Sequence, residues 1–199
     1  MSKRFDSLSE EHRAFIAEQR IFFTASATAE SRVNISPRPT DALRVPSDDV
    51  AMYLDLTGSG AETAAHLRID GRLTIMFCAL AGAPSILRLY GRGRTFALGT
   101  AAYTAALAEH FDGVAPHGAR QIVRLDIDLV QTSCGYGVPL FDYREERATL
   151  ERWTATKSED GLRAYRREQN SVSLDGLETG FAIETSLDDP RASATPLPS

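Results

Sequence analysis

Residues 52–77, MYLDLTGSGAETAAHLRIDGRLTIMF, decide the fold of this 199-residue chain. An apolar run rich in strand-forming residues ends at the small-residue turn TGSG. A helix-compatible segment follows, and IDG separates it from a second apolar run. This pattern predicts a strand over 49–56, a short helix through 61–67 and a strand over 72–80.

Further segments alternate as half-buried strands do. IFFTASAT (21–28) and VNIS (33–36) flank the polar turn AESR, which predicts a hairpin that Pro37 and Pro39 end. SILRLYGRGRTF (85–96) is expected to pair with 72–80 through the turn AGAPS. The stretch 121–133 is expected to place four apolar side chains on one strand face: Val123, Leu125, Ile127 and Leu129.

The order of these elements favours an antiparallel barrel, because a doubly wound parallel sheet needs a helix between nearly every pair of strands. The sequence therefore predicts an α+β protein with about six antiparallel strands and short peripheral helices. Helices are expected after a capping box of Ser7 and Glu10, over 99–111, and in the charged stretch 144–170, with a break at SEDG. Residues 1–184 are expected to form a single domain and 185–199 a disordered tail.

Charge and composition exclude several classes of function. A net charge of −5 and a pI near 5.4 argue against sequence-independent nucleic-acid binding, which requires a basic surface. No apolar run is long enough to span a bilayer, so we expect a soluble, cytoplasmic protein with no membrane partner. Cys78 and Cys134 form no CxxC pair, and the four histidines lack ligand spacing, so no metal site is expected.

Two polar clusters are candidate anion sites. In the turn at 57–60, Thr57 and Ser59 supply hydroxyls beside a helix start, and Thr63 adds a third. In NISPRP, Asn34 and Ser36 share one side of an extended segment with Arg38 just beyond, and a guanidinium suits a phosphate. Neither cluster is a Walker loop or a GxGxxG fingerprint. The alternative for the first cluster is an ordinary turn that joins a strand to a helix. The alternative for the second is a surface arginine that anchors a loop.

RVNISPRP, MYLDLTGSGAETAAHLRIDGRLTIMF and ILRLYGRGR, in this order, resemble the pyridoxamine 5′-phosphate oxidase-like FMN-binding split-barrel family. QTSCGYGVPLFDYREERATLERW resembles a signature of one branch of that family. The resemblance implies a six-stranded split barrel that forms a homodimer, with FMN in a groove between protomers. In that arrangement backbone groups of Asn34, Ile35 and Ser36 hydrogen-bond the flavin ring, and Arg38 lies near the phosphate. The hydroxyls of Thr57, Ser59 and Thr63 complete the phosphate site.

One departure from the family pattern concerns charge. The oxidases that give the family its name carry an Arg-Lys pair where this chain has Glu62 and Thr63. A carboxylate beside a phosphate is unfavourable unless it points away or is neutralised, so pyridoxamine phosphate is not the expected substrate.

The resulting hypothesis is an FMN-dependent oxidoreductase with a small-molecule substrate and no assigned catalytic residue. A split barrel that binds the deazaflavin F420 or haem is a second hypothesis. A non-catalytic module that binds a flavin or a small anion is a third. Cys134 lies in an expected exposed bend, and no sequence neighbour supplies a base that would make it a nucleophile.

Overall fold

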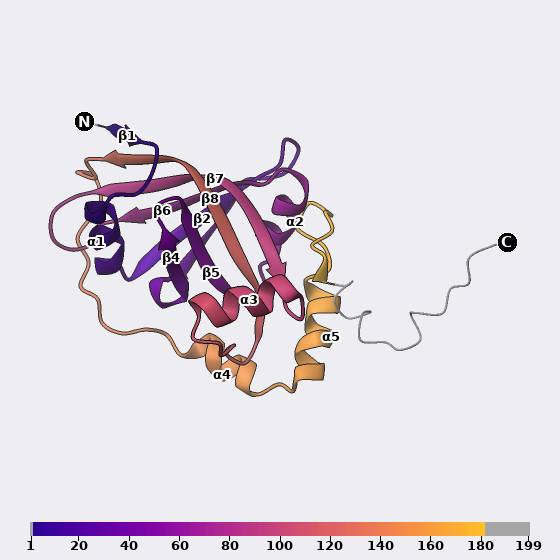
Figure 1. Cartoon of the computed structure of the whole chain (residues 1–199). Coiled ribbons are helices and arrows are strands. Elements are labelled where there is room, and N and C mark those ends of the chain that lie inside the picture. The colour runs from indigo at the N-terminus through magenta and orange to yellow at the C-terminus, as the bar shows by residue number, and fades with distance from the viewer. Residues whose placement is uncertain (1, 182–199) are drawn as a thin grey trace.

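The computed structural model describes residues 2–181, and the expected tail 185–199 lies outside that range. One curled antiparallel sheet forms the frame of the described chain (Figure 1). Its strands are β1 (Lys3–Phe5), β2 (Ile21–Ser26), β3 (Asn34–Pro39), β4 (Leu43–Ser47), β5 (Val50–Leu56), β6 (Arg72–Cys78), β7 (Ile86–Ala97) and β8 (Ala119–Ser133). They follow the order β3-β2-β6-β7-β8-β5-β4, and β1 pairs with the C-terminal end of β8. The predicted antiparallel α+β barrel is confirmed, with eight strands because the short strands β1 and β4 join the sheet.

The helices lie around this sheet. They are α1 (Glu10–Glu18), α2 (Glu62–Ile69), α3 (Ala101–His110), α4 (Thr149–Ala155) and α5 (Glu159–Gln169), with a 3-10 turn η1 at Thr40–Ala42. The expected break in the C-terminal helical stretch is confirmed, because Ser158 caps the start of α5. After β8 the chain runs down the side of α1 and then forms α4 (Figure 1). α5 follows and reaches the side of the sheet where α2 lies (Figure 1).

The two larger apolar clusters of the described residues hold the layers together. The larger one fills the inside of the curled sheet, where Phe22, Phe77 and Leu125 are fully buried and α1 adds Ile16. The second lies on the outer face of β5 and β8, which α3 covers with Leu107 and neighbouring side chains. Because both faces of β5 are covered, its polar residues are also withdrawn from solvent.

β3 runs through both prolines, so the prediction that Pro37 and Pro39 end the strand is wrong. Among the described strands, β3 lies at the edge of the sheet and pairs only with β2, where Pro37 faces Phe23 and Pro39 faces Ile21. A proline is tolerated on an edge strand because its missing N–H can fall on the side that has no partner.

The phase of β8 changes at a bulge, where Asp128 has no counterpart in β7. An extra residue reverses the alternation of faces. Val130 is therefore buried and Leu129 is not, which corrects the prediction for Leu129. The three earlier side chains of the predicted apolar face are buried as expected.

α1 begins later than predicted, with Ser9 as its N-cap. The Ser9 hydroxyl accepts from the His12 N–H, and the His12 ring accepts from the Ser9 N–H. The predicted capping box of Ser7 and Glu10 is wrong, because a histidine two residues further on makes the contact that glutamate usually makes.

Candidate functional site

A small cleft opens between the edge strand β3, the start of α2 and the adjoining ends of β5 and β8. Its volume is about 20 Å³, which is enough for a water molecule or a small polar group. The residues that line it are Asn34, Ser36, Arg38, Asp55, Gly60, Ala61, Glu62, Thr63, Arg120 and Gln121. We refer to this space as the cleft.

A buried ion cluster forms the floor of the cleft. Asp55 accepts from Arg38 Nη1 at 2.6 Å and from Arg120 Nε at 2.8 Å, and Gln121 Nε2 donates to it at 2.8 Å. The side chains of Asp55 and Arg120 are 2% and 4% exposed, and that of Arg38 is 18% exposed. Two guanidiniums therefore share one carboxylate where water hardly reaches.

The cluster sets the protonation state of Asp55. Burial alone would raise the pKa of this carboxyl, but the charges of Arg120 and Arg38 and the hydrogen bonds from Arg120 and Gln121 lower it to about 2. Asp55 is therefore ionised at neutral pH, and the three-residue cluster carries a net charge of +1.

Arg38 is held in one orientation. Its guanidinium lies 4.5 Å from the centroid of the Tyr53 ring, and its Nε donates to Thr24 Oγ1 at 3.3 Å. Burial raises the pKa of Tyr53, so the ring beneath the guanidinium stays a neutral phenol. The alternative of an arginine that merely anchors a surface loop does not describe these contacts.

Three uncharged polar side chains face the cleft from β3 and α2. Asn34 Nδ2 donates to Thr63 Oγ1 at 3.1 Å, and Ser36 Oγ donates to Asn34 Oδ1 at 3.3 Å. Behind Thr63, the hydroxyl of Ser26 lies 3.0 Å from His66 Nδ1, and both residues are buried. The structure thus brings together Asn34, Ser36, Arg38 and Thr63, which were predicted separately from two segments.

The other three predicted residues do not line the cleft. Ile35 points to the opposite face of β3, where it is 64% exposed. Thr57 is buried and donates to the Gly118 carbonyl at 2.8 Å. Ser59 is exposed on the turn. The carbonyl group of the next residue, Gly60, points inward and accepts from Arg120 Nη2 at 2.5 Å.

The C-terminal helix holds this turn from behind. Asn170, fully buried, donates to the carbonyl of Gly58 at 2.9 Å and accepts from Arg120 Nη1 at 3.1 Å. Arg166 donates to Thr57 Oγ1 at 3.0 Å. The predictions from sequence missed Asp55, Arg120 and Asn170. The available signal was a charged residue inside each of two apolar strands, which requires a buried partner.

Glu62 closes the cleft at the start of α2. Its Oε2 accepts from the Ala61 N–H at 3.0 Å, and its Oε1 accepts from the Leu174 N–H at 3.3 Å. Leu174 lies in a hairpin over residues 171–180, in which Val172 bridges Glu178. The carboxylate therefore already accepts from a backbone N–H group at the start of α2, the kind of place where anions bind in many proteins.

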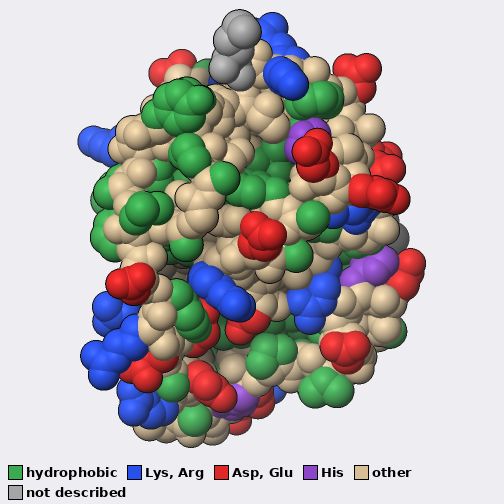
Figure 2. Space-filling model, turned by 90° about the vertical axis from the view of Figure 1, so that its left-hand side faces the viewer, with side chains coloured by type: hydrophobic (Ala, Val, Ile, Leu, Met, Phe, Trp, Pro, Cys, Tyr) green, Lys and Arg blue, Asp and Glu red, His purple; other side chains and the backbone are tan. Residues whose placement is uncertain are grey.

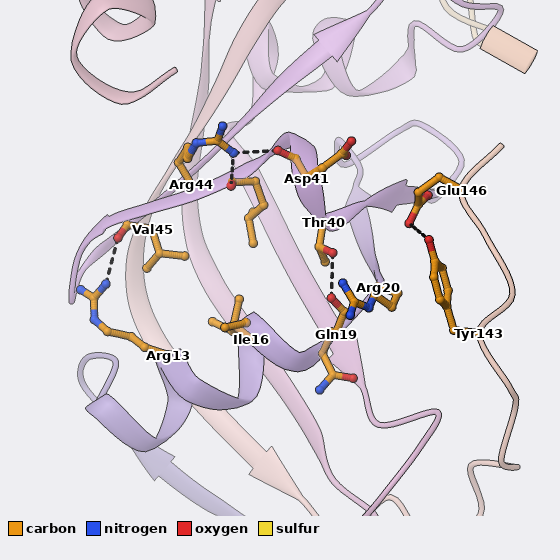
Figure 3. A pocket seen from close by; sticks show the side chains of 12 residues that line it. Arg13, Ile16, Gln19, Arg20, Thr40, Asp41, Arg44, Val45, Tyr143 and Glu146 are labelled. Atoms are coloured by element: carbon orange, nitrogen blue, oxygen red, sulfur yellow. Dashed lines mark hydrogen bonds between the residues drawn. The ribbon is translucent and has the colours of Figure 1, made fainter. Parts of the chain in front are cut away.

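A larger groove lies on another part of the molecule, between α1, the η1–β4 segment and the chain after β8 (Figure 3). We call it the α1 groove; its volume is about 500 Å³. Arg20 lies 5.3 Å from the centroid of the Tyr143 ring, and the Tyr143 hydroxyl donates to Glu146 at 2.9 Å. Acidic, basic and hydrophobic side chains are interspersed on the face that includes α1 (Figure 2). None of the predicted site residues lines the groove.

Cysteines and histidines contribute nothing to the cleft lining. Cys78 is buried, which raises the pKa of its thiol, and Cys134 is exposed as predicted. Within residues 2–181, no three His, Cys, Asp or Glu side chains gather as a metal site requires. No helix in that range is both long and apolar enough to cross a membrane.

Comparison with known proteins identifies relatives of the chain. The family profile described as pyridoxamine 5′-phosphate oxidase matches residues 8–134. The pyridoxamine 5′-phosphate oxidase family protein ustO of Aspergillus flavus is 36% identical over 191 residues, which cover 87% of this chain and 76% of that protein.

Solved structures that align with the chain are more distant. A Lactobacillus delbrueckii protein assigned as a pyridoxamine 5′-phosphate oxidase aligns with a TM-score of 0.49 and 14% identity, over 63% of this chain and 94% of its own. HutZ, the haem storage protein of Vibrio cholerae, aligns with a TM-score of 0.46 and 18% identity, over 61% of this chain and 92% of its own.

Proposed function

Because this chain belongs to the pyridoxamine 5′-phosphate oxidase family, we propose that it binds FMN and acts as a flavin-dependent oxidoreductase on a small molecule. The observation that carries the proposal is the shared carboxylate of the cleft. Arg38 and Arg120 share Asp55 as their one carboxylate partner among the described residues, beside the uncharged polar groups of Ser36 and Thr63. Apart from Glu62 at the start of α2, the charged side chains of the cleft carry one excess positive charge, and such a charge in a desolvated place favours an anionic ligand group.

The residues of the cleft fit the phosphate end of FMN. Arg38 would supply a charge-assisted hydrogen bond, and the amide of Asn34 and the hydroxyls of Ser36 and Thr63 would supply neutral ones. Arg120 lies behind them and contributes charge. When bound, FMN supplies the exchange of hydride or electrons, and the role of these side chains is to hold and orient it.

The cleft is far too small for a flavin ring, since small-molecule pockets usually measure ~300–1,000 Å³. We propose that the ring lies outside the cleft along β3, near backbone groups of Asn34, Ile35 and Ser36. On this edge strand Ile35 is 64% exposed and neighbouring Val33 is 68% exposed. An unpaired edge with exposed apolar side chains is unusual in a stable monomer. A second copy of the chain in a homodimer would cover both the edge and the ring.

The absorption spectrum of the purified protein, followed by identification of whatever heat releases from it, tests this proposal. We expect a flavin spectrum and release of FMN, with bleaching of the spectrum on addition of NAD(P)H or another reductant. Release of a deazaflavin or haem would show that this compound, and not FMN, is the bound cofactor. A protein that retains FMN but never turns over would be a binding module. Failure to retain or take up FMN would contradict the proposal.

A further inference from the structure

The charges that line the cleft balance to zero. Arg38 and Arg120 are positive, and Asp55 and Glu62 are negative. A phosphate that enters the cleft adds further negative charge to a site that has already been neutralised, and it meets Glu62 at short range. The cleft therefore accepts a phosphate only if one of its own negative charges moves away.

Asp55 is not the charge that moves. Its carboxylate accepts hydrogen bonds from two guanidiniums and one amide, and it is 2% exposed. Leaving it without these partners inside the protein would be costly. It is a fixed component of the site.

Glu62 is held much less firmly. Among residues 2–181, its two carboxylate oxygens accept only from the backbone N–H groups of Ala61 and Leu174, at 3.0 and 3.3 Å, and the residue is half-exposed. A rotation of this side chain into water breaks two ordinary hydrogen bonds and opens the start of α2. It also releases the hairpin 171–180 from α2 at Leu174.

We propose that Glu62 is an internal anion of the cleft, and that the phosphate of a bound ligand replaces it. This inference rests on the proposed function for the identity of the phosphate-bearing ligand. Glu62 thereby determines specificity: it lowers the advantage of a phosphorylated flavin over an unphosphorylated one. It also couples the occupation of the cleft to the C-terminal hairpin through Leu174.

The test compares FMN with riboflavin, which lacks the phosphate, in fluorescence titrations of the whole chain. Glu62→Gln removes the charge and keeps an oxygen acceptor. Glu178→Gln, on the exposed side of the same hairpin, is the matched control. We expect the ratio of the riboflavin Kd to the FMN Kd to rise about tenfold in Glu62→Gln and to stay unchanged in Glu178→Gln. An unchanged ratio, including the case in which both Kd values change by the same factor, would overturn the inference while FMN binding itself still stands.

Hydrogen exchange gives a second readout. FMN should speed exchange of the Leu174 amide in the unmodified chain, and riboflavin should not, because only the phosphate displaces Glu62. If no variant binds either flavin, the proposed function fails and inorganic phosphate becomes the probe. Thermal stabilisation by phosphate that is larger in Glu62→Gln than in Glu178→Gln would then still support the inference. Equal stabilisation in both variants would overturn it.

Discussion

The cleft and the α1 groove differ in size and in how their charges are held. The α1 groove is the larger by far, at about 500 Å³ against about 20 Å³. Its arginine and glutamate side chains lie where solvent reaches them, and Arg20 contacts an aromatic ring rather than a carboxylate. In the cleft, Arg120 and Asp55 are nearly without solvent contact. In the α1 groove Arg13 also has a carboxylate partner, Asp48, but the Asp48 side chain is 65% exposed. The burial of the charges in the cleft, and not its volume, is therefore the reason to propose the ligand site there.

The largest effect is expected from breaking the ion cluster. Arg120→Ala leaves Asp55 with one guanidinium and removes the donors to Asn170 and Gly60. Loss of one partner of a buried charge pair costs about 3–5 kcal/mol of the free energy of unfolding. Denaturant unfolding measures this loss. The control is Arg124→Ala, which removes a partly exposed pair with Asp126 on the same strand and should cost under ~1 kcal/mol. Equal losses for the two variants would show that the cluster is no more important than a surface pair.

A smaller loss of the free energy of unfolding is expected when the pH is lowered. The pKa of Asp55 is about 2 in the folded chain against an ordinary 3.8, because of Arg120 and Arg38. A lowered pKa stabilises the folded state at pH values above the unfolded pKa. This contribution, about 2 kcal/mol, disappears as the pH falls from 3.8 to about 2. Unfolding free energies measured across this window should fall in the unmodified chain and in Asp126→Asn. The part of this fall that comes from Asp55 should be missing in Asp55→Asn. If Asp55→Asn showed the same slope of unfolding free energy with pH as the unmodified chain, the lowered pKa of Asp55 would be contradicted.

The smallest effect is expected in the α1 groove. Arg20→Ala removes a guanidinium that packs on the exposed ring of Tyr143, a contact worth about 0.5–1 kcal/mol at most. The thermal midpoint should therefore move by only a few degrees. If Arg20→Ala lost as much free energy of unfolding as Arg120→Ala, the charged side chains of the α1 groove would contribute as much to stability as those of the cleft.

Local sequence patterns predicted the parts of the molecule that depend on neighbours along the chain. The alternation of 72–80 and 85–96 predicts the β6–β7 hairpin, and the period of NIS places Asn34 and Ser36 on one face. Arg38 was expected beyond the strand and joins that face because β3 continues through Pro37. The bulge at Asp128 was not predicted, since nothing in the alternating run 121–133 marks the residue that leaves the ladder.

The floor of the cleft depends on contacts between distant residues. Asp55 and Arg120 meet because β5 pairs with β8, and Asn170 joins them because the C-terminal helix returns to the turn at 57–60. Composition and period carry no information on which of several arginines lies opposite a given aspartate. The same limit explains why Thr57 and Ser59 were predicted to face a ligand although neither lines the cleft.

The affinity for FMN distinguishes the cleft from the α1 groove as the place where we propose that the ligand binds. A Ser36→Ala, Thr63→Ala double variant, checked for an intact fold by its thermal midpoint, should bind FMN at least about tenfold more weakly, because hydrogen bonds to a charged group are lost. Arg20→Ala should bind FMN as the unmodified chain does. Unchanged affinity in the double variant, or a loss confined to Arg20→Ala, would show that the cleft does not hold the phosphate of FMN.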